Sequence, residues 1–215
     1  MRDGGVMHGF QIWVNLPAAN KMVEPHFTMF WRDAIPKFRA QDAAGRKLEI
    51  DVIAGSLGDV HALAPPPNSW AAHASNEVAI WLIKLEPGAQ WTLPAASHGI
   101  QRTLYFHGGE TLRVAGHDIQ VKHGAELNAA TAVVLENGNA EAHLLLLQGR
   151  PIDEPVVSYG PFVMNSRAQI EQAFADYRST EFGGWPWPKK DPVHDPARGR
   201  FARYVDGTVD EPGGR

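Results

Sequence analysis

Short apolar stretches separated by turn residues occupy the middle of the chain. The connectors are rich in Pro, Gly and Asn, as at 65–68, 86–88 and 137–139. Many short strands with such turns predict an all-β sandwich or barrel. Two stretches, 80–83 and 144–147, are apolar at every position, which predicts central strands between packed layers. The expected strands are Leu48–Ile53, Gly58–Leu63, Val78–Leu85, Thr103–Phe106, Thr111–Val114, Ile119–Lys122, Ala132–Leu135 and Ala142–Leu147.

The N-terminal segment His8–Pro17 shows the alternation of a strand, with Phe10, Ile12, Val14 and Leu16 on one face. Few residues precede it, so we expect a strand that belongs to a sheet built elsewhere. Each large apolar side chain left in water forgoes roughly 1.5–3 kcal/mol. An unpaired apolar strand also favours edge-to-edge association. We therefore expect a homodimer, or contact with a protein partner, through this exposed strand.

Two further stretches lie before the expected sandwich. Residues 26–31 lie between Pro25 and Pro36 and are interpreted as a crossing arm or an edge strand. The polar residues Arg39–Arg46 are interpreted as a turn.

One helix is predicted near the C-terminus. Ser166 and Gln169 form a capping box at its start. Apolar residues follow at the spacing that places them on one face of a helix. The helix is expected to end near residues 178–179. The apolar stripe consists of Ile170, Ala173, Phe174 and Tyr177.

An extended tail is expected after the helix. Proline recurs through residues 185–192, which excludes a helix and a central strand. We expect this tail to lie over the body of the protein, with Trp185 and Trp187 as its contacts. Stacking of the two rings on a sugar or a peptide is the alternative.

Composition narrows the possible functions. The chain of 215 residues has a net charge of −4, a pI near 6.2 and no run of basic residues, which argues against nucleic-acid binding. Neither a membrane-spanning apolar run nor an apolar leader is present, so a cytoplasmic location is expected. The absence of Cys excludes disulfides, thiolate ligands and a Cys nucleophile.

Ten His residues raise the question of a metal site. A mononuclear site of the cupin type needs about three imidazoles and one carboxylate around one cation. The usual spacing is Gly-x5-His-x-His-x3,4-Glu-x6-Gly, because alternate strand residues face the same way. In the best alignment of this motif with the sequence, both glycines are present, but none of the His and Glu ligands is. The motif positions fall on Gly88, Pro94, Ala96, Ile100 or Gln101, and Gly108.

The remaining candidates for a degenerate metal site are His98, His107 and Glu110. We interpret them as turn and surface residues, and assign no metal-binding, cofactor-binding or catalytic residue. The nucleophile elbow Gly-x-Ser-x-Gly and the glycine-rich phosphate loops are also missing.

Several segments together resemble the pirin family of bicupin proteins. The similar segments run in the same order as in that family, over about residues 7–180. They are Gly9–Pro17 with Lys21-Met22, Asp51–Gly55, Leu85–Gly88, Arg102–Phe106, Glu154–Val157 and Tyr159–Asn165.

The resemblance implies two cupin barrels, of which the N-terminal one holds a mononuclear iron through three His and one Glu. Some family members open the flavonol ring of quercetin with dioxygen, and the mammalian protein is a transcriptional cofactor. None of the four ligands can be assigned here, and we expect their motifs upstream of Met1. Accordingly, residues 1–44 are expected to be a remnant of the N-terminal barrel with a linker arm, 45–180 the C-terminal cupin domain, and 181–215 the tail.

Three functions follow as hypotheses. The leading one is a pirin-like structural or interaction module without iron and without dioxygenase activity. The alternative is a fragment of an intact iron-dependent quercetin 2,3-dioxygenase. The third is a small-ligand or carbohydrate-binding module that uses an empty barrel and the Trp pair.

Overall fold

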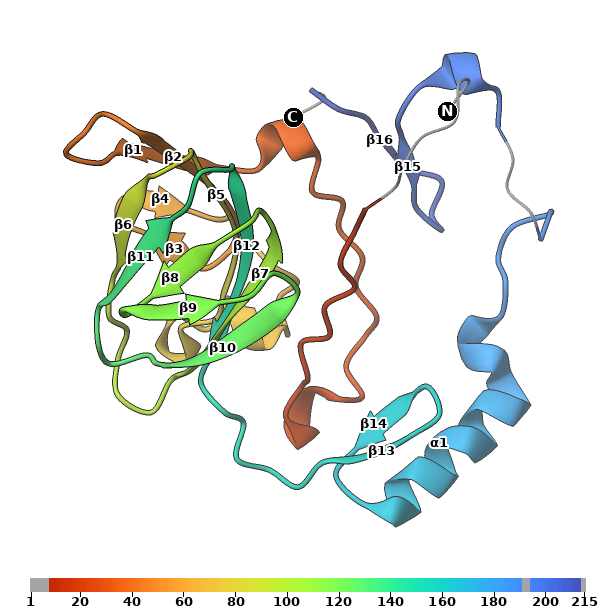
Figure 1. Cartoon of the computed structure of the whole chain (residues 1–215). Helices are drawn as coiled ribbons and strands as arrows, with labels where there is room; N and C mark the ends of the chain where they lie inside the picture. Colours follow the sequence, from red (N-terminus) through yellow and green to blue (C-terminus); the bar gives the residue numbers. More distant parts are fainter. Residues whose placement is uncertain (1–7, 191–193, 214–215) are drawn as a thin grey trace.

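A computed structural model describes residues 8–190 and 194–213. Two antiparallel sheets face each other as a sandwich (Figure 1). They stay two hydrogen-bonded units and do not close into one barrel. The larger sheet has the order β1 (Lys37–Gln41), β2 (Lys47–Ala54), β5 (Ala79–Leu85), β12 (Ala142–Gly149), β7 (Gln101–Gly108) and β10 (His123–Asn128). The smaller sheet has the order β6 (Gln90–Leu93), β11 (Val133–Asn137), β8 (Leu112–Val114) and β9 (His117–Ile119).

Smaller elements surround the sandwich. The strand pairs are β3 (Ser56–Leu57) with β4 (Val60–His61), β13 (Val157–Tyr159) with β14 (Phe162–Met164), and β15 (Ala202–Arg203) with β16 (Val209–Asp210). The α-helix is α1 (Arg167–Thr180), and the 3-10 turns are Ala18–Asn20, Arg32–Ala34, Trp70–Ala72, Ala74–Asn76, Glu181–Gly183 and Pro196–Arg198. Among the described residues, none of the helices combines the length and the apolar character needed to cross a bilayer.

The core lies between the two sheets. Alternate residues of each strand point inward, so β2 buries Leu48, Ile50 and Val52 while the residues between them face outward. Strands β5 and β12 lie in the middle of the larger sheet, which confirms the prediction from their apolar sequences. Fully buried side chains fill the interior, among them Leu85, Leu93, Leu104, Phe106, Leu135, Leu144 and Leu146.

The prediction of a turn over Arg39–Arg46 was wrong at its start, because β1 continues to Gln41. The polar residues of β1 face outward and form ion pairs with the neighbouring strand β2. Lys37 Nζ lies 3.0 Å from Glu49 Oε1, and Arg39 Nε lies 2.7 Å from Glu49 Oε2. The intervening Phe38 packs against the core. An edge strand with charged outward positions therefore resembled a turn.

The expected strand Ile119–Lys122 is also misplaced, and of the expected strand Gly58–Leu63 only β4 at Val60–His61 is a strand. Strand β9 ends at Ile119, and the chain turns through Lys122, whose φ is +67°. The next strand, β10, was not predicted. It is an edge strand whose residues are half-buried or exposed, so its sequence lacks a clear apolar face.

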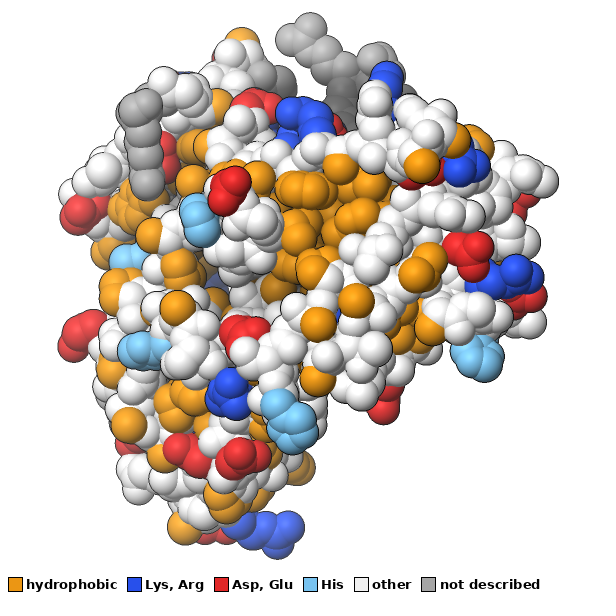
Figure 2. All heavy atoms as spheres, turned by 90° about the vertical axis from the view of Figure 1, so that its left-hand side faces the viewer, with side chains coloured by type: hydrophobic (Ala, Val, Ile, Leu, Met, Phe, Trp, Pro, Cys, Tyr) orange, Lys and Arg blue, Asp and Glu red, His pale blue; other side chains and the backbone are white. Residues whose placement is uncertain are grey.

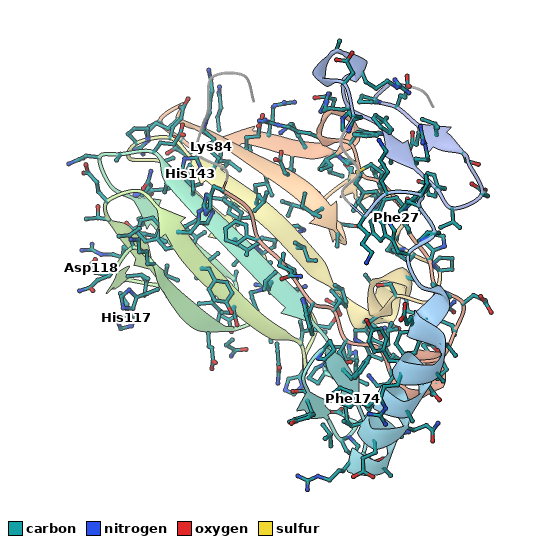
Figure 3. The ribbon with its side chains drawn as sticks, turned by 90° about the vertical axis from the view of Figure 1, so that its right-hand side faces the viewer. Phe27, Lys84, His117, Asp118, His143 and Phe174 are labelled. Atoms are coloured by element: carbon teal, nitrogen blue, oxygen red, sulfur yellow. The ribbon has the colours of Figure 1, made fainter. Side chains whose placement is uncertain are left out.

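The N-terminal segment forms no strand, which corrects the prediction for His8–Pro17. Among the described residues, no hydrogen bond joins residues 8–16 to a sheet. These residues, called the strap below, cross the outer face of the larger sheet as an extended chain (Figure 3). Ile12 and Leu16 are half-buried, whereas Trp13 is 66% exposed. Phe10 and Val14 of the same alternation are 43% and 39% exposed. The segment therefore touches the sheet face at a few side chains, such as Phe10 against His107, and does not pair at a sheet edge.

Residues 26–31 form an extended arm without strand pairing, and the C-terminal tail packs against this region. The ring centroids of Phe27 and Tyr204 lie 5.3 Å apart, and Arg200 Nη2 lies 2.8 Å from Asp33 Oδ2. Trp185 is about half exposed, and its indole N–H donates to Lys189 within the tail itself. Contacts of Tyr204 and Arg200, and not Trp185, therefore hold the tail against the arm.

Part of the predicted tail, Asp191–Pro192, lies outside the described residues, as does Met1. Trp187, the second predicted contact of the tail, is half-buried.

The helix prediction is confirmed. The Gln169 backbone N–H donates to Ser166 Oγ at 3.3 Å, and Gln169 Oε1 accepts from the Asn165 backbone N–H at 3.1 Å. Ile170 and Ala173 of the predicted stripe are buried. The other two stripe residues, Phe174 and Tyr177, contact Phe162 of the β13–β14 hairpin.

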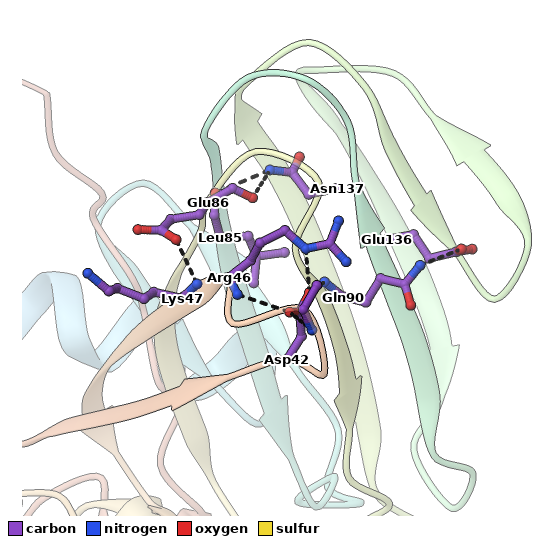
Figure 4. A network of polar contacts seen from close by, with 9 residues as sticks. Asp42, Arg46, Lys47, Leu85, Glu86, Gln90, Glu136 and Asn137 are labelled. Carbon is purple, nitrogen blue, oxygen red and sulfur yellow. Dashed lines mark hydrogen bonds and ion pairs between the residues drawn. The ribbon is translucent and has the colours of Figure 1, made fainter.

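A polar network closes one end of the sandwich (Figure 4). The buried Asn137 amide donates to the carbonyl oxygens of Leu85, Glu86 and Ala140 at 3.2, 2.8 and 2.8 Å. Glu86 in turn accepts from the Lys47 backbone N–H at 2.7 Å. The network thus joins the ends of β2, β5 and β11.

Replacing this amide should destabilise the fold. We expect Asn137→Ala to lower the free energy of unfolding by about 1–3 kcal/mol, because buried carbonyl oxygens lose their donor. Urea unfolding followed by circular dichroism measures the change. Asn139→Ala, at an exposed position of the same turn, is the matched control and should stay within about 0.5 kcal/mol of the parent. Equal effects of the two substitutions would contradict this role of the network.

Candidate functional site

The interior of the sandwich is where a metal site of the cupin type would lie. The two positions that the motif reserves for His carry Pro94 and Ala96, in the loop after β6. Of the two positions open to the carboxylate, Ile100 is buried and Gln101 is exposed. None of these four side chains supplies a metal ligand of the kind that the motif requires.

A buried arginine takes up the inner face of β7 next to these positions. Arg102 is 4% exposed, and its Nε and Nη2 donate to Gln148 Oε1 at 2.7 and 2.5 Å. Its Nη1 donates to the Pro94 carbonyl oxygen at 2.8 Å. Gln148 Nε2 donates to the carbonyl oxygen of Glu77 at 3.0 Å, which completes the network.

The charge of Arg102 disfavours a cation in this part of the interior. Burial lowers the pKa of Arg102 and the Glu77 carboxylate raises it, but a guanidinium stays protonated in proteins. Its positive charge would repel a divalent metal at short range. In the part of the chain that the structure describes, no three or more His, Asp or Glu residues gather so that they could hold a metal ion. The interior residues therefore do not fit an iron centre.

The three weak candidates do not come together. His98 precedes β7 and His107 lies near the end of the same strand. The strand part of the path alone, from Gln101 to His107, covers six steps and spans roughly 20 Å at a rise of about 3.3 Å per residue. Glu110 is exposed in the turn after the strand. These residues cannot share one ion.

His107 instead belongs to a cluster on the outer face of the larger sheet, which we call the histidine cluster: His8, Phe10, His107 and His143. The His107 ring centroid lies 4.9 Å from that of Phe10, 5.4 Å from that of His8 and 6.0 Å from that of His143. Burial lowers the pKa of His107, and the neighbouring His8 and His143 lower it further.

An ion-pair chain borders the cluster. His143 Nε2 lies 3.1 Å from Glu141 Oε1, and Glu141 Oε2 lies 2.9 Å from Lys84 Nζ. Figure 3 shows His143 and Lys84 side by side on this face. In the sequence, His143 falls within the expected strand Ala142–Leu147 and His8 begins the segment His8–Pro17, and no motif links the two. The one sequence signal was that His107 and His143 occupy positions of their strands that alternate with the buried ones, which indicates that both point outward.

A second feature is a groove between the strap, the β13–β14 hairpin and α1, which we call the hairpin–helix groove. Its volume is about 920 Å³, and its lining is mainly apolar. Exposed hydrophobic side chains contribute to it, with Met22 75% and Val156 62% exposed. Phe162 and Met164 of β14 form its floor on the hairpin side. Such a surface is typical of a protein-binding site.

On the face that Figure 2 presents, Lys and Arg side chains lie interspersed with Asp and Glu, around a hollow lined by hydrophobic side chains. The cross-strand pairs on β1 and β2 follow the same mixed pattern.

Comparison with protein families matches residues 80–183 to the pirin C-terminal cupin domain. The chain is 34% identical over 181 residues to the pirin-like protein of Caulobacter vibrioides, which covers 84% of this chain and 61% of the relative. It is 31% identical over 181 residues to pirin of Homo sapiens, which covers 82% of this chain and 57% of the relative. The chain thus spans about 60% of the length of these relatives.

Solved structures agree. The crystal structure of quercetin 2,3-dioxygenase from Acinetobacter baumannii superposes with a TM-score of 0.66 at 30% sequence identity, over 80% of this chain and 55% of that one. The similarity confirms the predicted cupin fold and the resemblance drawn from the sequence motifs. The expected boundaries at residues 44/45 and 180/181 stay predictions. The chain belongs to the pirin family of quercetin 2,3-dioxygenase-like cupins, and it contains the family's C-terminal cupin domain.

Proposed function

We propose that this chain acts as a non-catalytic interaction module of the pirin family. The observation that carries the proposal is the buried Arg102–Gln148 pair, which occupies the interior beside the positions of the cupin metal motif. A guanidinium there supplies no ligand and repels the cation that the family's chemistry needs.

The packing of the interior supports the same conclusion. Leu93, Leu104, Phe106 and Leu144 are fully buried between the sheets, so side chains occupy the space that a substrate would need. The hairpin–helix groove, by contrast, opens on the outside of the sandwich. Binding is therefore better supported at the surface than inside the fold.

The proposed occupant of the groove is a companion cupin barrel, carried on the same polypeptide or on another one. The matched part covers 57–61% of the relatives, which therefore hold further polypeptide beside the C-terminal cupin domain. A companion barrel would cover Trp13, Met22 and Val156, which otherwise face water. We assign any dioxygenase chemistry to that companion barrel.

Iron binding tests the non-catalytic role. After anaerobic loading with Fe(II) and desalting, we expect far less than one iron per chain by mass spectrometry and no consumption of quercetin. The Acinetobacter baumannii quercetin 2,3-dioxygenase, treated in parallel, is the positive control. Stoichiometric iron with quercetin turnover in this chain would overturn the proposal and favour an iron-dependent dioxygenase.

Self-association tests the groove. Without a companion barrel, copies of the chain should associate through this apolar surface, as sedimentation velocity over a concentration series would show. Val156→Glu places a charge in the groove and should weaken association by about tenfold or more. Val134→Glu is the matched control, because Val134 is an exposed valine on β11, outside the groove. A wild-type monomer at every concentration, or equal effects of both variants, would contradict the docking role.

A further inference from the structure

The strap is attached to the sandwich by side-chain contacts alone. The described residues show no hydrogen bond between the strap and the larger sheet. At one end, the rings of His8 and Phe10 pack on His107. Further along, Ile12 and Trp13 line a small cavity above the sheet. An attachment of this kind can be released without breaking a β-ladder.

The strap covers apolar surface on the outer face. Leu145 lies directly opposite Leu82 and Tyr105 on the neighbouring strands, and it points away from the core. It is nevertheless only 4% exposed. Along β12 it stands between His143, which touches the histidine cluster, and Leu147, which lines the cavity beneath the strap. The path of the strap between these two points accounts for the burial of Leu145.

Several elements bring titratable groups to the cluster. The strap contributes His8, β7 contributes His107 and β12 contributes His143. Nearby charges come from Glu141 before β12, Lys84 on β5 and Lys122 in the turn beside the end of β7. Glu141 is the carboxylate that contacts this group, and it is already paired with Lys84. Protonated imidazoles would therefore repel one another with little compensation.

From this geometry we infer that the strap is a pH-sensitive element: it lies closed on the outer face at neutral pH and is released as His107, the half-buried centre of the histidine cluster, becomes protonated. Release would expose Leu145 and the apolar outer positions of β5 and β12. The only reactant that the release requires is a proton on the His107 ring.

The sign follows from linkage. In the closed state, burial and the neighbouring imidazoles hold the pKa of His107 below its ordinary value. Release removes His8 and admits water, so the open state binds protons more readily. The closed state is therefore favoured above a pH of about 6.5 and loses this advantage as the pH falls below it.

Release would also change the hairpin–helix groove, because Ile12–Leu16 of the strap form one of its walls. This consequence rests on the proposed function, whereas the release itself does not. A low pH would then remove a wall of the docking surface.

The chain contains no Cys, so a single introduced thiol reports on the strap. In Leu145→Cys, we would measure the rate of reaction with 4,4′-dithiodipyridine from pH 8 to pH 5. Each rate is divided by the rate of the same variant in denaturant at the same pH, which removes the titration of the thiol. We expect this ratio to rise as the pH falls, by about tenfold for each unit of pKa depression.

Two further variants in the Leu145→Cys background identify the group responsible. His107→Phe retains a ring against Phe10 without a titrating nitrogen, and should abolish the rise. His98→Phe is the matched control at an exposed histidine outside the cluster, and should keep it. A ratio that stays flat with pH, or one that rises equally in His107→Phe, would overturn the inference.

The wild-type chain provides a measurement that does not depend on an introduced thiol. NMR titration of the histidine ring protons should show one imidazole with a pKa below the ordinary range, and Phe10→Ala should move it upward. The absence of such a histidine would overturn the inference. If the thiol ratio rises at low pH while Val156→Glu leaves self-association unchanged, only the proposed docking function fails.

Discussion

The pairing of β5 with β12 in the centre of the larger sheet is the constraint on which the rest of the structure depends. Both strands are apolar on both faces, so neither face can be left in water. The smaller sheet covers the inner face and completes the core. On the outer face, the part of the chain that the structure describes places the strap and no second sheet. The burial of Leu145 outside the main core shows that this cover matters.

The two covers differ in how they are held. The inner one is fixed by interdigitated side chains and by the polar network around Asn137, which joins three strand ends. The outer one, over the residues that the structure describes, makes no hydrogen bond to the sheet and meets it through rings and apolar side chains. The same chain therefore has a rigid core and a less firmly held outer cover. Elements held by few contacts are those that open first in native proteins.

Much of the fold could be predicted from the sequence, because a strand or helix with one buried face repeats its apolar residues at a regular spacing. The central strands, the sandwich class and the capping box of α1 were all evident in this way. Strands β1, β6 and β10 were missed because their outward residues are polar and all three lie at sheet edges. An alternation of apolar and polar residues fits a strand paired at a sheet edge and also an extended chain lying on a sheet face. For this reason the strap was wrongly predicted to be a strand. The histidine cluster joins residues 8, 107 and 143, which only the folded chain brings together.

The buried Arg102 shows why the fold alone does not establish a chemistry. The core of a cupin sandwich is filled by the inward-facing side chains of neighbouring strands. Any side chains of suitable total volume can fill it, whether or not they bind a metal. In this chain the inward pair on β7 and β12 is Arg102 with Gln148, which satisfy each other by hydrogen bonds. An isolated buried guanidinium would be costly, and these acceptors offset that cost without a metal or a substrate. The hydrogen-bonding needs of Arg102 are thus met within the fold, and this pairing is what supports the proposal of a function at the surface.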